Sequence, residues 1–243
     1  MGLLLSTRRT MVSAGQTYSD KVMGYGPIAY WPLNEVSGTT AACLVNAAQN
    51  GTYSSDVSAM GIGTGIGDGN TAVYFDGAND YVNILTATMT AAFGKLTGTF
   101  MIWGKVNAVG IWTDGAQHYL AQLRADANDY FVMAKAVANN RLIHTYRAGG
   151  VSEILLEDAV STTAWSCHVV TWDKTGTGNA ISYRDSTPIN TLAIANNWTA
   201  NLTLAVIGAQ NVVPNNAWHG WLAHCALWDR PLSVAEITAL AAV

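Results

Sequence analysis

The chain has 243 residues and a net charge of -4, and only 12% of its residues are charged, about half the usual share. Arg8 and Arg9 form the only adjacent basic pair, so the sequence lacks the basic stripe typical of nucleic-acid-binding proteins. No apolar run approaches the roughly 18 residues that a membrane-spanning helix needs. The low charge leaves two interpretations open. Either the surface is neutral and rich in Gly, Ala, Thr and Asn, or another copy or the subunits of a larger assembly cover part of it.

Residues 1–17 show no hydrophobic periodicity and are predicted to form an N-terminal arm. The apolar run at its start is too short for a secretory signal peptide, so no Sec signal is expected. Burying a leucine contributes about 1.5–3 kcal/mol, whereas ordering each backbone residue costs about 1–2 kcal/mol. We therefore expect the arm to dock onto a neighbouring subunit, with its leucines buried and its arginines at the rim. The residues expected to make this contact are Leu3, Leu4, Leu5, Arg8 and Arg9.

The first predicted elements are a short helix over residues 18–23, ended by Gly24, and two strand-like runs within residues 71–84. The Asp76-Gly77 pair between those runs is typical of a hairpin turn. Residues 99–106 carry apolar side chains at both alternating sets of positions. This pattern indicates a strand that is covered on both faces.

The second half of the chain predicts further antiparallel strands. Two hairpins are expected over residues 118–137 and 141–156, with turns at residues 126–129 and 148–150. Single strands are expected at residues 165–172, 180–184, 202–207 and 218–228. Because no helical pattern of 10–15 residues separates these runs, they favour an antiparallel sandwich or barrel.

A short C-terminal helix is predicted by a capping box, in which Ser233 and Glu236 satisfy free backbone N–H groups at the helix start. The three cysteines are far apart in the sequence and odd in number, which disfavours a disulfide framework. They are interpreted as small buried side chains. These residues are Cys43, Cys167 and Cys225.

Several segments occur in the order found in laminin-G-like domains. Residues 25–35 read Tyr-Gly-Pro-Ile-Ala-Tyr-Trp-Pro-Leu-Asn-Glu, and residues 75–77 read Phe-Asp-Gly. A Trp-containing segment follows at residues 165–173, and residues 227–233 read Leu-Trp-Asp-Arg-Pro-Leu-Ser. Over residues 18–243 the chain therefore resembles laminin-G-like, concanavalin A-like jelly-roll domains of bacterial surface and phage proteins. The resemblance implies an all-β fold of two antiparallel sheets with a short C-terminal helix, whose core includes Trp31, Phe75, Trp165 and Trp228.

Many members of this family bind a structural calcium ion through acidic residues after the opening motif and near the end of the domain. Here residues 42–46 contain no acid, and Ala223 and His224 occupy the second region. Calcium requires several oxygen ligands, so no metal and no cofactor is expected. Asp76 and Asp80 are interpreted as turn-capping residues.

Catalysis is also disfavoured. Glucan-cleaving relatives carry a Glu-x-Asp-x-Glu strand, and a retaining glycosidase needs two nearby carboxylates. Glu153 and Glu157 have the outer spacing, but Leu155 stands at the centre. Both glutamates are therefore predicted to lie on a solvated strand face, and the chain is predicted not to be an enzyme. His219 and His224 are five residues apart on one strand, and Cys167 and His168 are adjacent, so each pair should point in opposite directions.

Loops with tryptophan and amide side chains are candidates for binding sugars, whose apolar faces stack on aromatic rings. An alternative is that these tryptophans pack on a neighbouring subunit. The candidate residues are Trp112, Asp114, Gln117, Trp198, Asn215, Asn216 and Trp218. The sequence favours a non-catalytic binding or structural module of an extracellular or virion (phage) assembly, which acts as an oligomer or on other subunits and can bind a surface glycan. The alternatives are a stand-alone lectin and, third, a jelly-roll glycan hydrolase.

Overall fold

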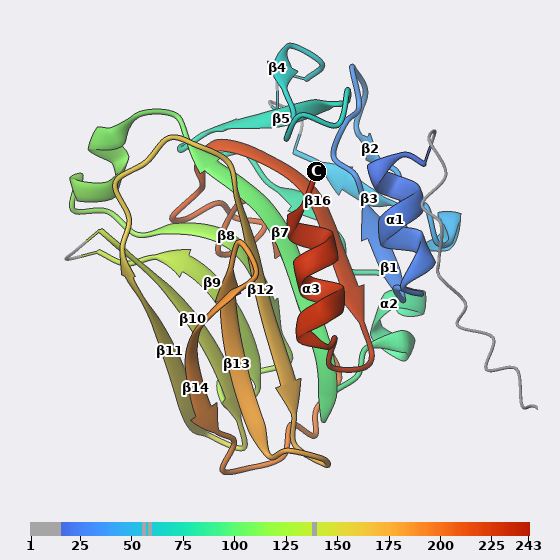
Figure 1. Cartoon of the computed structure of the whole chain (residues 1–243), viewed down its shortest axis with the longest axis vertical. Coiled ribbons are helices and arrows are strands. Elements are labelled where there is room, and N and C mark those ends of the chain that lie inside the picture. Colours follow the sequence, from blue (N-terminus) through green and yellow to red (C-terminus); the bar gives the residue numbers. More distant parts are fainter. Residues whose placement is uncertain (1–15, 55–56, 58–59, 138–139) are drawn as a thin grey trace, which may run out of the picture.

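Two antiparallel sheets pack face to face in the computed structural model of the chain (Figure 1), which describes residues 16–54, 57, 60–137 and 140–243. Among these residues each sheet contains eight strands. The strands interleave along the sequence, so each sheet combines segments from both halves of the chain. The predicted all-β jelly-roll sandwich is confirmed.

The first sheet, called sheet A, has the order β14-β13-β12-β7-β16-β5-β4, and β1 also pairs with β16. At its centre, β7 lies between β12 and β16, and its residues from Gly98 to Gly104 are all buried. This confirms the prediction of a strand covered on both faces. The strands of sheet A are β1 (Ala29–Trp31), β4 (Gly63–Thr64), β5 (Thr71–Asp76), β7 (Thr97–Val106), β12 (Ser166–Asp173), β13 (Asn179–Arg184), β14 (Thr187–Ala193) and β16 (His219–Trp228).

The second sheet, called sheet B, has the order β11-β10-β9-β8-β15-β6-β3-β2. The predicted hairpins are present as β8-β9 and β10-β11. Gly149 and Gly150 both have positive φ angles in the β10-β11 turn, a conformation that glycine adopts without steric cost. The strands of sheet B are β2 (Thr40–Ala41), β3 (Gly51–Tyr53), β6 (Val82–Asn83), β8 (His118–Arg124), β9 (Tyr130–Lys135), β10 (Arg141–Ala148), β11 (Val151–Ala159) and β15 (Leu204–Ile207).

The helices are α1 (Tyr18–Gly24), α2 (Ala87–Ala92) and α3 (Val234–Ala241), with 3-10 turns η1 (Ala47–Gln49) and η2 (Val109–Thr113). Capping boxes begin both α1 and α3, the latter at Ser233 as predicted. Helix α3 lies across the outer face of sheet A (Figure 1). Tyr18 and Val22 of α1 and Ile237 and Leu240 of α3 belong to one apolar cluster with outward residues of that sheet.

The hairpin predicted at Asp76-Gly77 is wrong. Strand β5 pairs with β16 in sheet A, whereas β6 pairs with β15 and β3 in sheet B. The segment between them therefore crosses from one sheet to the other. The capping interpretation of the two aspartates is confirmed, because Asp76 Oδ1 accepts from the Ala78 N–H and Asp80 Oδ2 accepts from the Asp76 N–H, both at 2.8 Å.

Aromatic residues from both sheets fill the space between them. Trp31, Phe75 and Trp172 are fully buried in the main core, and Trp228 is buried under the helices of sheet A. Trp165 is only partly buried, so its assignment to the core is wrong. Its ring lies 5.0 Å from the Lys105 ammonium group, which suits an aromatic residue at the rim.

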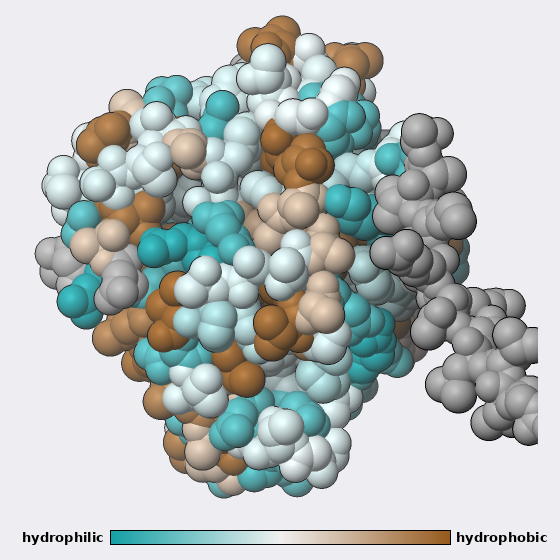
Figure 2. Space-filling model, in the orientation of Figure 1, coloured by the Kyte–Doolittle hydropathy of each residue, from teal (hydrophilic) through white to brown (hydrophobic). Residues whose placement is uncertain are grey.

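The three cysteines are buried free thiols, as predicted. In the part of the chain that the structure describes, no helix is long and apolar enough to cross a membrane. Figure 2 shows that apolar residues form separate patches among hydrophilic ones on the face that carries α3. The arm residues Leu3, Leu4, Leu5, Arg8 and Arg9 lie outside the described residues.

Candidate functional site

Two of the predicted sugar-stacking tryptophans meet at one end of the sandwich. Trp112 is 4% exposed and Trp218 1% exposed, and their rings pack edge to face with centroids 6.5 Å apart. The Trp112 indole N–H donates to the Thr162 carbonyl at 2.8 Å, and that of Trp218 donates to the Lys105 carbonyl at 3.3 Å. Both indoles are therefore core residues that hold loops in place.

Trp198 lies at the opposite end of the sandwich. It is 1% exposed, packs on Phe93 and Tyr146, and donates to the Ala200 carbonyl at 2.9 Å. The prediction that these three tryptophans offer stacking faces to a sugar is corrected by their burial. The sequence pattern of Trp beside Asn and Gly fits a buried loop anchor as well as a binding platform, and only the fold distinguishes the two.

Asp114 is bound within the protein. Its carboxylate accepts from His118 Nε2 and from the buried ammonium group of Lys135, both at 2.7 Å. Burial by itself raises the pKa of Asp114, but the hydrogen bonds from Lys135 and His118 outweigh it and lower the pKa to about 2. This carboxylate thus fastens its loop to β8 and β9.

The remaining predicted residues, Gln117, Asn215 and Asn216, line the same end of the sandwich, where the last two are exposed. Asn216 Nδ2 donates to Gln210 Oε1 at 2.9 Å, and the Asn216 carbonyl accepts from the Tyr119 N–H. These contacts place the loop of residues 208–217 beside β8. The loop therefore borders the outer face of sheet B.

The two sheets differ in what covers their outer faces. Helices cover the outer face of sheet A, whereas the apolar clusters on the outer face of sheet B contain no helical residue among those described. Its side chains form cross-strand rows. One row reads Asn83, Val206, Gln122, Val132 and Thr145, and the next reads Leu204, Arg124, Tyr130, Arg147 and Ser152.

Gln122 occupies the middle of this face. It pairs with Val206 on one side and with Val132 on the other, and it is only 4% exposed. Its Oε1 atom has no hydrogen-bond partner, although a buried amide without a partner costs about 1–3 kcal/mol. The same burial closes Oε1 to solvent, so Gln122 belongs to the packing of this face rather than to its exposed surface.

An aromatic and cationic pair flanks Gln122. The Arg147 guanidinium lies 5.7 Å from the Tyr130 ring centroid and donates to Ser152 Oγ at 2.8 Å, which fixes the guanidinium plane. Tyr119 adds a second ring on the same face. Sequence reasoning missed this surface, although alternation of Gln122 and Arg124 with Ala121 and Leu123 was a usable signal.

Glu153 and Glu157, which were considered as a pair for hydrolysis, lie in different environments. Glu153 is partly exposed and its Oε1 accepts from the Ala195 N–H at 3.3 Å. Glu157 is 1% exposed, so the prediction of a solvated strand face is wrong for it. It points between the sheets because Leu155, two residues earlier, faces the core and strand side chains alternate.

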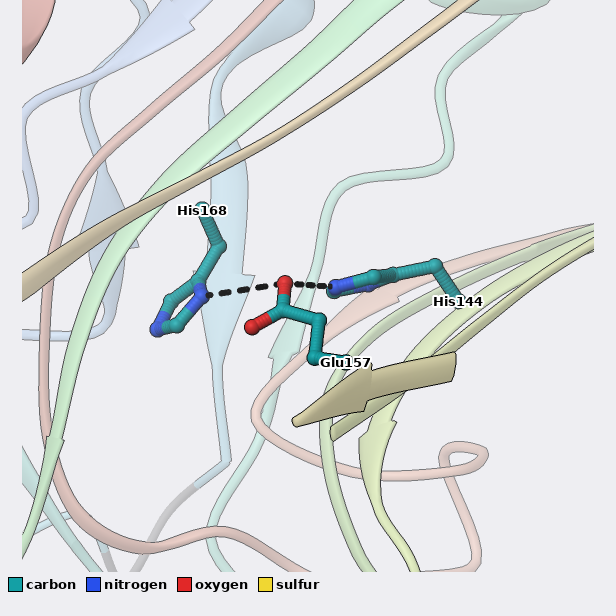
Figure 3. Close-up of side chains that lie close together, drawn as sticks. All are labelled: His144, Glu157 and His168. Atoms are coloured by element: carbon teal, nitrogen blue, oxygen red, sulfur yellow. Dashed lines mark hydrogen bonds and ion pairs between the residues drawn. The ribbon is translucent and has the colours of Figure 1, made fainter. Parts of the chain in front are cut away.

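Glu157 forms a buried cluster with His144 and His168, which come from β10 and β12 (Figure 3). Glu157 Oε1 lies 2.5 Å from His144 Nε2 and 3.9 Å from His168 Nδ1. Burial by itself raises the pKa of Glu157, but the two histidines outweigh it and hold that pKa well below its ordinary value. His168 thus faces the interior and Cys167 faces the helices, as predicted for that pair.

The region where relatives carry acids for calcium is occupied by a hydrogen-bonded histidine. His224 Nε2 lies 3.1 Å from Asp68 Oδ2, and Nδ1 lies 2.7 Å from the Tyr30 hydroxyl. Burial raises the pKa of Asp68, but the contact with His224 and that with Asn70 lower it to about 2. The Asp68 carboxylate therefore lies beside a buried imidazole at this position, and the absence of calcium stays a prediction.

The fold has many solved counterparts of low sequence identity. Domain 4 of AbnA, an extracellular arabinanase from Geobacillus stearothermophilus seen with arabinotriose, has a TM-score of 0.66 and 12% identity over 88% of this chain and 98% of that one. The receptor-binding domain of botulinum neurotoxin C/D mosaic serotype gives 0.67 and 11%, covering 88% and 50%. The Trypanosoma rangeli sialidase gives 0.60 and 10%, covering 88% and 32%. This chain thus spans half or less of the toxin domain and the sialidase.

No curated protein matches the sequence. The family described as the concanavalin A-like lectin/glucanases superfamily, Laminin_G_3, matches residues 76–238. That span is more than half of the chain and includes every strand from β6 to β16. The chain belongs to the concanavalin A-like lectin/glucanase superfamily.

Proposed function

We propose that this chain is a non-catalytic glycan-binding module and that the outer face of sheet B is its binding surface. The observation that carries the proposal is the partly exposed pair of Tyr130 and Arg147, on a sheet face whose apolar clusters contain no described helical residue. A binding face needs groups that are held in place before the ligand arrives, because ordering them on binding lowers affinity. Arg147 meets this condition through its contacts with Tyr130 and Ser152.

The side chains on this face are of the types that bind sugars. Sugar C–H faces stack on aromatic rings, and the partly exposed Tyr130 supplies such a ring. Sugar hydroxyls accept hydrogen bonds from guanidinium groups such as that of Arg147. The loop of residues 208–217 would form one wall of the site.

Two of the structural neighbours support the proposal of a glycan-binding module. One is a domain of an extracellular arabinanase seen with arabinotriose, and another is a toxin receptor-binding domain. We propose that this module likewise works outside cells or on a virion surface, attached to other subunits. Its placement in a phage particle and its oligomerisation are proposals that depend on the N-terminal arm.

Binding to immobilised and soluble oligosaccharides tests the proposal, with arabino-oligosaccharides and sialylated glycans in the panel. Tyr130→Ala should weaken binding by about tenfold, since an aromatic contact contributes about 0.5–1.5 kcal/mol beyond its buried area. Arg147→Ala should weaken it as well. Tyr74→Ala is the matched control, because Tyr74 contacts Trp221 on sheet A.

The proposal fails if glycans bind but Tyr130→Ala and Arg147→Ala bind as well as the unmodified chain. It also fails if Tyr74→Ala weakens binding to the same degree. Release of shorter sugars during prolonged incubation, lost in Glu157→Gln, would contradict the non-catalytic assignment.

A further inference from the structure

The His144, Glu157 and His168 cluster takes no part in the proposed glycan site, because its side chains point between the sheets rather than outward. All three residues are at least 97% buried. Their nearest nitrogen and oxygen atoms all lie within 4.8 Å of one another. We propose that these three side chains bind a divalent transition-metal ion, for which Zn²⁺ is the best match.

The donor set suits this ion. Two imidazole nitrogens and one carboxylate are ligands that zinc takes in proteins, with bonds of about 2.0–2.2 Å and a tetrahedral arrangement. Those bond lengths separate neighbouring ligand atoms by about 3.3 Å. The observed 2.5 Å between His144 and Glu157 has to open and the 3.9 Å between Glu157 and His168 has to close. These two changes are each under 1 Å, and the His144 and His168 nitrogens, which lie within 4.8 Å of each other, have to close by at most about 1.5 Å.

Two atoms of the cluster have only long ion-pair contacts and no hydrogen bond. His168 Nδ1 and Glu157 Oε2 are buried without a hydrogen bond, and Figure 3 shows His168 Nδ1 directed at the Glu157 carboxylate. Buried polar atoms of native proteins are nearly always paired. A metal ion between the three side chains would bind His168 Nδ1 and replace the hydrogen bond between His144 and Glu157.

Arg184 places a positive charge next to the proposed metal site. Its Nη1 lies 3.6 Å from Glu157 Oε2, and its side chain is 24% exposed, whereas that of Glu157 is fully buried. An entering dication repels this guanidinium, and its partial exposure lets it move toward solvent. Removing Arg184 should therefore tighten metal binding, while a purely structural role for the cluster gives no reason for that gain.

A bound ion would join the two sheets. His144 and Glu157 belong to β10 and β11 of sheet B, and His168 belongs to β12 of sheet A. An ion held by all three stabilises the folded chain, because the unfolded chain does not bring these ligands together. The stabilisation follows the ratio of free metal to Kd.

The experiment uses the full chain freed of metal by chelator dialysis. Titration with ZnCl₂ should give one site per chain and raise Tm by about 5–10 °C at a free zinc concentration about 100 times Kd. Co²⁺ in place of zinc should produce the visible absorption of tetrahedral cobalt. His168→Ala should abolish both signals, Arg184→Ala should lower Kd, and His219→Ala, a histidine outside the cluster, should change neither.

Three results would overturn the proposal: no stoichiometric zinc binding by the unmodified chain, zinc binding by His168→Ala equal to that of the unmodified chain, or a rise in Kd for Arg184→Ala. If His168→Ala does not fold, crystals of the unmodified chain grown with ZnCl₂ decide the question. An anomalous peak among the three side chains supports the site, and a peak elsewhere or none refutes it. None of these outcomes depends on glycan binding.

Discussion

Asp129 offers the sharpest test of how loops are held on this sandwich. It is 3% exposed and lies just before β9. Its Oδ1 accepts from the Gly149 N–H at 2.7 Å, and its Oδ2 accepts from the N–H groups of Thr199 and Ala200 at 3.1 Å. One carboxylate thus joins the β10-β11 turn to the loop that carries Trp198.

Asp129→Asn replaces one of the two acceptor oxygens by an NH₂ group. Whichever way the amide turns, at least one buried backbone N–H then faces a donor. A hydrogen bond to a charged group contributes about 1.5–3 kcal/mol, so we expect the free energy of unfolding to fall by about 2–3 kcal/mol. For a chain of this length that corresponds to a decrease in Tm of roughly 5–10 °C.

The loss should also depend on pH. Burial raises the pKa of Asp129, but the backbone hydrogen bonds outweigh it and hold that pKa below its ordinary value. A lowered folded pKa means that the stabilisation is complete above the unfolded value of about 3.9 and is lost as the pH falls through the folded value. The difference between the two proteins should therefore be full at neutral pH and shrink below about pH 4.

Urea unfolding at neutral and acidic pH measures both effects. Asp126→Asn is the matched control, because Asp126 is exposed in the same turn and a single oxygen, Oδ1, accepts both of its backbone hydrogen bonds, which asparagine preserves. A loss below about 0.5 kcal/mol for Asp129→Asn, within the range of ordinary surface changes, would refute the reasoning. So would a loss that is the same at pH 3 as at pH 7.

Three further outcomes are expected. Trp172→Ala should lower the free energy of unfolding in urea by about 3–5 kcal/mol, because this fully buried indole packs on Phe131 and Tyr146; a loss under 1 kcal/mol would contradict its place in the core. Calcium added to the chelator-treated chain should leave Tm unchanged in a thermal melt, whereas a rise of several degrees would reveal a calcium site. Deletion of residues 1–16 should leave a folded sandwich with weaker oligomerisation by ultracentrifugation, and undiminished self-association would show that the arm is dispensable.

Local chemistry allowed much of the fold to be predicted from the sequence. The capping box at Ser233, the turn glycines Gly149 and Gly150, and the doubly apolar run of β7 each act within a few residues, so the chain alone indicates the element. The order of the family motifs then indicated the jelly-roll arrangement, which the strand pairing confirms.

The sites required the tertiary structure, because burial depends on which strand lies opposite. Trp112 and Trp198 stand in polar loop sequences, yet loop packing against the core buries both rings. Glu157 is a charged residue of a type usually found at the surface, but the second sheet places His168 over it.

Dependence on distant strands also explains why the hairpin predicted at Asp76-Gly77 is wrong. A turn dipeptide predicts a reversal of direction, but it does not specify whether the following strand pairs with the preceding one. Here β16 and β15, which are contributed by residues more than 100 positions later, supply the partners of β5 and β6. Short-range preferences thus determined the elements of this protein, and long-range pairing between the sheets decided which side chains became buried, paired or free to bind.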